Sequence, residues 1–207
     1  MAREALAAAY RALAAAGLIA GSSGNISVRD GAGMLISPTG ATAERIDAAD
    51  VVACALDKGA PRASSEWALH GAIYVARPEV GAIVHTHADA CTALACLNEG
   101  LPAFHYGVLA FGGADVRCAP YVTFGTPALA VLALEAMDGR TACLLANHGM
   151  IVAGASLDRA VDGALELERL ARQYLLARGA GTPRLLTAAE VSAAQERFLT
   201  YQAASRA

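Results

Sequence analysis

The spacing of apolar and polar residues predicts a chain in which helices and strands alternate. Leu6, Leu13 and the alanines around them fit one face of an amphipathic helix over residues 2–16. Helical patterning recurs in five later segments: 64–77, 88–98, 128–137, 157–178 and 187–201.

Short apolar runs between turn-forming residues predict the strands. Residues 25–40 predict a hairpin that turns at its Asp-Gly-Ala-Gly stretch and is followed by a Pro-Thr-Gly turn. Residues 50–56 and 81–85 each predict one strand, and residues 141–154 predict a strand, a sharp turn and a second strand. The passage 100–127 is rich in glycine and proline, and no regular element is predicted there.

Strands interleaved with helices are typical of a layered α/β or α+β domain. The hairpin near the N-terminus favours a mixed sheet over a purely parallel one. The chain of 207 residues has no internal repeat, low-complexity linker or charge block. We therefore expect one domain over residues 1–207.

Composition and charge argue against several classes of protein. A net charge of -3 without a basic stripe disfavours nucleic acid and anionic membranes as partners. No run of about 18 uncharged apolar residues predicts a transmembrane helix, and Glu4 and Arg11 make the N-terminus a poor signal peptide. The chain has 5 cysteines, an odd number, and none of them are spaced as CxxC. This use of cysteine predicts that the protein resides in a reducing cytoplasm.

The candidate chemistry starts with two histidines at the end of the 81–85 strand. His85 and His87 stand on one face of an extended chain, roughly 6.5 Å apart at their roots, so both rings could reach one metal ion. A catalytic zinc site needs a third protein ligand. His148 is a candidate for this ligand, because it precedes Gly149, where the chain can turn sharply. A short His-x-His pattern is equally typical of strand-end histidines with hydrogen-bonded rings.

Four further stretches favour a metal site over ordinary strand-end histidines: GSSGNIS at 21–27, SPTG at 37–40, SSEWALH at 64–70 and HYGVLAFGG at 105–113. Together with HTH and NHG, in this order and spacing, they resemble the class II aldolase/adducin family, and within it the fuculose-phosphate type of aldolase. The resemblance extends from about Gly17 to Tyr201. It implies a three-layer αβα sandwich with a mixed, mainly antiparallel sheet, and a cyclic homotetramer with active sites between subunits.

The resemblance also implies the site residues. The zinc ligands of the family match His85, His87 and His148. Glu66 matches the catalytic carboxylate, which also ligates the metal while the site is empty. Tyr106 and Tyr201 match catalytic tyrosines that come from the neighbouring subunit. The phosphate site of the family matches Ser23, Gly24, Asn25, Thr39, Gly40, Ser64 and Ser65.

The implied activity is reversible cleavage of a ketose 1-phosphate into dihydroxyacetone phosphate and an aldehyde. Cleavage beside a ketone leaves negative charge on an enediolate, which Zn²⁺, or another divalent ion such as Mn²⁺ or Co²⁺, would stabilise. Glu66 would move a proton at the carbon that becomes the carbanion, and Tyr106 would serve the hydroxyl on the aldehyde side. Hydroxyls, the Asn25 amide and backbone N–H groups would hold the phosphate, because no lysine or arginine motif is present.

Two alternatives stay open on the same scaffold. A ribulose-5-phosphate 4-epimerase or a sugar-acid phosphate decarboxylase would use a similar site, but the epimerases usually carry Asp in place of Glu66 and a third histidine in place of Ala90. A non-enzymatic adducin-like scaffold would lack the ligands. Candidate substrates are L-fuculose 1-phosphate and 5-deoxy- or 5-methylthioribulose 1-phosphate; an apolar pocket around residues 108–113 would suit a methyl or methylthio end.

Several of these residues also have ordinary structural interpretations. Ser64 or Ser65 could simply cap the helix that stops before Pro78. His70, one turn after Glu66, is expected to be structural or to support the site. Glu168, on the long helix, is expected to be solvated or paired.

Overall fold

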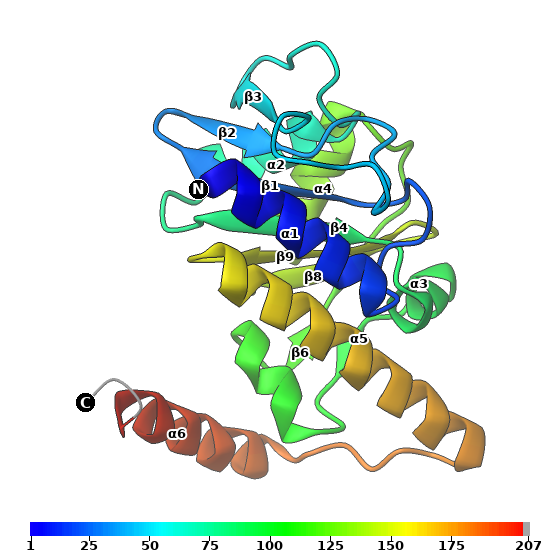
Figure 1. Cartoon of the computed structure of the whole chain (residues 1–207). Helices are drawn as coiled ribbons and strands as arrows, with labels where there is room; N and C mark the ends of the chain where they lie inside the picture. Colours follow the sequence, from blue (N-terminus) through cyan, green and yellow to red (C-terminus); the bar gives the residue numbers. More distant parts are fainter. Residues whose placement is uncertain (205–207) are drawn as a thin grey trace.

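The computed structural model describes the backbone of residues 1–204 and the side chains as far as residue 198 (Figure 1). Its centre is a seven-stranded sheet in the order β3-β2-β1-β4-β9-β8-β7. All neighbouring pairs are antiparallel except β7 and β8, so the sheet is mixed and mainly antiparallel, as the sequence predicts. The strands are β1 Asn25–Asp30, β2 Gly33–Ile36, β3 Val52–Ala55, β4 Ala82–Thr86, β7 Cys118–Ala119, β8 Ala142–Leu145 and β9 Gly149–Gly154.

Helices cover both faces of this sheet (Figure 1). One core cluster joins the sheet to α1 (Ala2–Ala15), α3 (Asp89–Cys96) and α5 (Leu157–Ala180). The other joins it to α2 (Trp67–Ala76) and α4 (Pro127–Ala136). The expected three-layer αβα arrangement is confirmed.

The alternation of side chains along the central strands explains the two cores. In β4, Ile83 packs into the α2–α4 cluster and Val84 into the α1–α5 cluster. Ile151 and Val152 of β9 divide in the same way. All four are at most 2% exposed, so these strands are buried on both faces and read as continuous apolar runs.

The predicted hairpin forms where expected. β1 and β2 pair from Ser27–Ile36 to Asp30–Gly33, and Gly31 in the two-residue loop adopts a φ of 56°. Residues 100–127 do contain regular structure that the sequence pattern missed. This passage holds β5 (Leu101–Pro102), η1 (Tyr106–Phe111), β6 (Asp115–Val116) and β7. These strands have two residues each, which is too short to produce a periodic pattern.

The last helix lies apart from the sheet layers and contacts η1 (Figure 1). α6 spans Ala188–Ala204. Thr187 and Glu190 form a reciprocal cap at its start: the Thr187 N–H donates to Glu190 Oε2 (2.8 Å), and the Glu190 N–H donates to Thr187 Oγ1 (3.3 Å).

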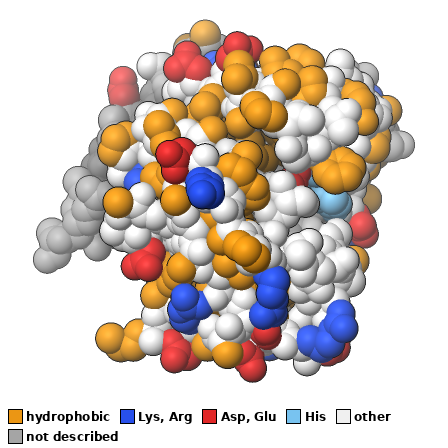
Figure 2. Space-filling model, turned by 90° about the horizontal axis from the view of Figure 1, so that it is seen from above, with side chains coloured by type: hydrophobic (Ala, Val, Ile, Leu, Met, Phe, Trp, Pro, Cys, Tyr) orange, Lys and Arg blue, Asp and Glu red, His pale blue; other side chains and the backbone are white. Residues whose placement is uncertain are grey.

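On the face seen in Figure 2, basic and acidic side chains are interspersed and form no continuous basic stripe. Within the described part of the chain, no helix combines the length and apolar character needed to cross a membrane.

Candidate metal centre and substrate pocket

A pocket of about 390 Å³ opens at the edge of the sheet where β4 ends and β1 and β9 begin. Antiparallel pairing brings these ends together: Asn25 lies opposite His85, and Thr86 lies opposite Met150. The pocket is lined by Ser22, Ser23, Gly24, Asn25, Pro38, Thr39, Gly40, Ser64, Ser65, Glu66, His85, His87, Phe124, Asn147 and His148.

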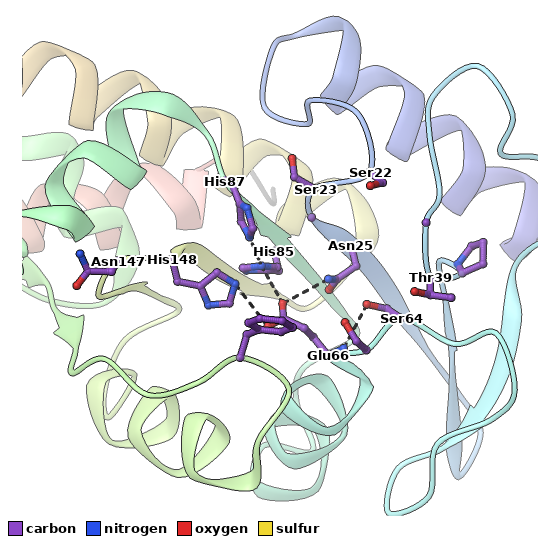
Figure 3. A pocket seen from close by; sticks show the side chains of 15 residues that line it. Ser22, Ser23, Asn25, Thr39, Ser64, Glu66, His85, His87, Asn147 and His148 are labelled. Carbon is purple, nitrogen blue, oxygen red and sulfur yellow. Dashed lines mark hydrogen bonds and ion pairs between the residues drawn. The ribbon is translucent and has the colours of Figure 1, made fainter.

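Three histidines converge at one side of this pocket (Figure 3). One ring nitrogen from each of His85, His87 and His148 lies within 4.8 Å of the other two. The Nε2 atoms of His85 and His87 are 3.1 Å apart. His85 Nδ1 lies 2.8 Å from the Met150 carbonyl oxygen, which can only accept, so Nδ1 carries the proton and Nε2 presents a lone pair to the pocket.

The Glu66 carboxylate completes the cluster. Its Oε2 lies 2.8 Å from His85 Nε2 and its Oε1 lies 3.5 Å from His148 Nε2. The Asn25 amide donates to Oε2 across 3.5 Å, whereas the buried Oε1 has no hydrogen-bond partner among the described residues. Three imidazole nitrogens and one carboxylate are a donor set that suits Zn²⁺, and a cation between them would satisfy the orphaned oxygen.

Burial tunes these groups toward metal binding. It lowers the pKa of His87 and of His148 to about 4, with a further contribution from His85. Both rings are therefore neutral near pH 7, the form that ligates metals. For Glu66, burial raises the pKa, but His85, His148 and His70 together outweigh it and hold the pKa below its ordinary value, so the carboxylate stays ionised.

The turn that delivers His148 differs from the one expected. Gly149 is the first residue of β9 rather than the turn residue, and Asn147 adopts the left-handed conformation, with a φ of 54°. Glycine is needed at 149 for a different reason. A Cβ there would lie 2.4 Å from the Thr86 carbonyl oxygen and 2.9 Å from His87 Cδ2, so close packing against the β4 end excludes a larger residue.

All seven residues matched to a phosphate site line the pocket. In Figure 3, Asn25 lies beside Glu66 and the histidines, whereas Thr39 lies farther from them. The seven residues come from the loop before β1 and its first residue Asn25, the loop after β2 and the segment before α2. None of the lining residues is lysine or arginine. Hydroxyl, amide and backbone N–H groups near the N-terminus of α2 are therefore the donors available to an anion.

The expected cap of α2 is corrected by the structure. The helix begins at Trp67 with Glu66 as its N-cap, so neither Ser64 nor Ser65 caps it. The Ser64 hydroxyl instead accepts from the Glu66 N–H in the turn before the helix (3.3 Å). This placement leaves both serines on the pocket wall and sets the catalytic candidate Glu66 at the helix start.

Other predicted residues lie elsewhere. Tyr106, in η1, is 59% exposed and does not line the pocket of its own chain. Tyr201 falls in α6, and its side chain lies outside the described residues. None of residues 108–113, around which an apolar pocket was expected, lines this pocket, and Val108 and Phe111 are buried in the core.

Four pocket residues have no counterpart among the predicted site residues: Ser22, Pro38, Phe124 and Asn147. Ser22, Pro38 and Asn147 lie inside the motifs GSSGNIS, SPTG and NHG, so these motifs could have suggested them. Phe124 lies in the passage without a pattern, and no sequence signal marks it.

His70 belongs to a buried polar chain behind the site. Ser27 Oγ lies 2.7 Å from His70 Nδ1 and 2.9 Å from the Tyr74 hydroxyl. Burial, followed by the effect of His85, lowers the pKa of His70 to about 3. The ring is therefore neutral near pH 7.

Comparison with known proteins agrees with this fold. The family described as Class II Aldolase and Adducin N-terminal domain matches residues 4–175. A 5-methylthioribulose-1-phosphate/5-deoxyribulose-1-phosphate aldolase from Rhodospirillum rubrum is 46% identical over 202 residues, which cover 96% of this chain and 91% of that protein. An L-fuculose phosphate aldolase from Escherichia coli is 41% identical over 189 residues, or 89% of this chain and 88% of that protein.

A solved structure of L-fuculose 1-phosphate aldolase superposes with a TM-score of 0.89 at 38% identity and covers 95% of both chains. The chain therefore belongs to the class II aldolase and adducin family. Its named relatives are aldolases, enzymes that cleave carbon–carbon bonds, and both relatives are named for phosphorylated sugars.

Proposed function

We propose that this protein is a metal-dependent aldolase that cleaves a ketose 1-phosphate into dihydroxyacetone phosphate and a small aldehyde. The observation that carries the proposal is the convergence of three imidazole nitrogens and one buried carboxylate beside a wall of hydroxyl and amide groups. The hydroxyl and amide groups suit the phosphate on C1 of such a substrate, and the cation site suits the ketone at the neighbouring C2.

His85, His87, His148 and Glu66 are the residues that would hold the cation, with Zn²⁺ as the first choice and Mn²⁺ or Co²⁺ as alternatives. The cation would act as a Lewis acid for the negative charge that develops on the ketone oxygen. The carbonyl of Met150 fixes the His85 ring in the tautomer that this role needs.

During cleavage the bond between C3 and C4 breaks and its electron pair stays on C3. The C4 hydroxyl loses its proton as the aldehyde forms, and C3 gains a proton. Glu66 is placed for the transfer at C3, because its carboxylate faces the pocket and has one oxygen without a hydrogen-bond partner among the described residues. The phosphate would be held by Ser23, Gly24, Asn25, Thr39, Gly40, Ser64 and Ser65.

The proton at C4 needs an acceptor, and no tyrosine lines the pocket among the described residues. Tyr106 is exposed and absent from the lining, which supports a homotetramer in which a neighbouring subunit supplies Tyr106, and Tyr201 with it. Light scattering of the purified protein, with a mixed-subunit complementation assay of a Tyr106→Phe variant and a Glu66→Gln variant, tests this assembly. A fully active monomer would contradict it.

The names of the relatives support 5-deoxy- or 5-methylthioribulose 1-phosphate and L-fuculose 1-phosphate as the candidate substrates. The decisive experiment offers these three compounds to the purified protein and measures release of dihydroxyacetone phosphate. Activity should disappear with a chelator and return with Zn²⁺. Release that is insensitive to the chelator, or an epimerised or decarboxylated product in place of the two fragments, would refute the proposal.

A further inference from the structure

Glu168 of α5 is buried, contrary to the solvated or paired position expected for it, and its place bears on the metal centre. The side chain is inside the core, with the residue 8% exposed. Its Oε1 accepts from the Ala90 N–H and its Oε2 from the Cys91 N–H, each across 2.9 Å. A buried carboxylate that spans two backbone donors holds them in one geometry.

These two donors are the ones that a helix cap normally satisfies. Ala88 is the N-cap of α3, so Ala90 and Cys91 are the second and third helical residues. Alanine has no side-chain acceptor, and α3 has no cap hydrogen bond of its own. Glu168 is 78 positions away from Ala90 along the chain. It therefore provides the hydrogen-bond acceptors that a capping side chain would otherwise supply.

The helix that Glu168 holds lies between the two loops that deliver metal ligands. At its start, α3 follows His87 after a single residue, Ala88. At its other end, the Ala95 carbonyl accepts from the Asn147 N–H across 3.1 Å, and Asn147 directly precedes His148. The position of α3 therefore fixes the backbone next to His87 and the backbone next to His148.

We propose that Glu168 is a positioning residue for the metal centre: by capping α3 from α5, it fixes the directions from which His87 and His148 approach the cation. This inference rests on the proposed function, since it needs a cation bound by these histidines. It adds a residue that touches neither the cation nor the substrate.

The test measures Zn²⁺ affinity of the purified protein by competition with a chromogenic chelator. Glu168→Ala should weaken binding by about 10-fold or more, as loss of groups that orient metal ligands does. The matched control is Glu166→Gln, on the same helix, where the carboxylate pairs with Arg169 at the surface; its affinity should equal that of the unchanged protein.

A second substitution separates positioning from mere stability. Adding Ala88→Ser to Glu168→Ala provides a local hydroxyl for the same two N–H groups, and should recover most of the lost affinity. Where Glu168→Ala fails to fold, Glu168→Gln is measured instead, since it keeps the side-chain size and one acceptor.

Three results would overturn the inference. One is a lower melting temperature of Glu168→Ala with unchanged Zn²⁺ affinity, which would make the role purely structural. Another is a loss of affinity that Ala88→Ser does not reverse at all. If the unchanged protein itself binds no Zn²⁺, the proposed function fails first and the inference falls with it.

Discussion

His85 donates its Nδ1–H to the carbonyl oxygen of Met150, 2.8 Å away on the adjacent strand β9. This bond links two features that are far apart in the sequence, the strand end that bears His85 and the start of the strand that follows His148. Because the same pairing sets the ring orientation and brings His148 alongside, sheet register alone assembles much of the candidate metal centre.

Replacement of His87 by alanine should remove metal and activity together. The substitution deletes one of three imidazole ligands, so Zn²⁺ affinity should fall by at least about 100-fold and aldol cleavage with it. Metal content after gel filtration and the rate of dihydroxyacetone phosphate release are the two measurements. Cys96→Ser is the control, because Cys96 is an exposed thiol that could bind Zn²⁺ adventitiously. Full activity in metal-free His87→Ala would contradict the scheme.

Replacement of Glu66 by glutamine should separate binding from chemistry. The three histidines remain, so the metal should stay largely bound, whereas the amide cannot accept and return a proton. We expect kcat to fall by about 100-fold to 10,000-fold. A variant that loses Zn²⁺ but, once resupplied with it, turns over at the normal rate would rule out the proton-transfer role of Glu66.

The metal-free protein should lose stability as the pH falls from about 6.5 to about 4. In the unfolded chain histidines titrate near their ordinary pKa of about 6.5, whereas burial holds the pKa of His87 and of His148 at about 4 in the folded chain. The unfolded state therefore binds protons first, and each histidine lowers the free energy of unfolding by up to about 1.4 kcal/mol per pH unit within this window.

Urea unfolding in the presence of a chelator, at about pH 7.5, 6 and 5, measures this dependence. His87→Gln removes one of the titrating rings and should flatten the slope between the two lower values. Stability that stays level or rises on acidification would show that the rings are not held neutral.

The sequence predicts the layers of this fold because apolar periodicity reports burial directly. The 81–85 run and the 141–154 pair appear as central strands since both faces are covered. The two-residue strands β5, β6 and β7 are different: β5 and β6 pair with each other, and β7 pairs with the longer β8, so each depends on a backbone partner distant in the sequence. The local sequence does not predict such pairing.

The residues of the candidate site also differ in how far the sequence alone predicts them. His85 lies in β4 and His87 directly follows the last residue of this strand, and their spacing alone suggests a shared ligand. His148 joins them through β4–β9 pairing, which the sequence does not specify, so its place before Gly149 makes it a candidate and the family resemblance assigns it as a ligand. Glu168 carries no motif, and its role depends on the distance between α5 and α3, a purely tertiary property.

Loss of the Ser27 hydroxyl should destabilise the fold behind the site. Ser27 Oγ bonds both His70 Nδ1 and the Tyr74 hydroxyl, and all three residues are at most 1% exposed. Ser27→Ala leaves two buried polar groups without this partner, at a cost of about 1–3 kcal/mol for each unsatisfied group. Tyr74→Phe, which leaves the Ser27–His70 bond intact, should cost less. Urea midpoints compare the two, and equal stability of Ser27→Ala and the unchanged protein would refute the argument.

Replacement of Gly149 by alanine should damage both stability and metal binding. The new Cβ would stand 2.4 Å from the Thr86 carbonyl oxygen and 2.9 Å from His87 Cδ2, so the ends of β4 and β9 must separate. Overpacking of this kind costs about 1–3 kcal/mol, and the shift displaces His87 from its partners. Gly179→Ala is the matched control, because a Cβ there meets nothing within 4 Å on helix α5, and it should stabilise the protein slightly. Thermal unfolding and Zn²⁺ titration of both variants test this prediction. Normal Zn²⁺ affinity in Gly149→Ala would contradict it, because the close approach of β9 to His87 would then not determine the geometry of the metal centre.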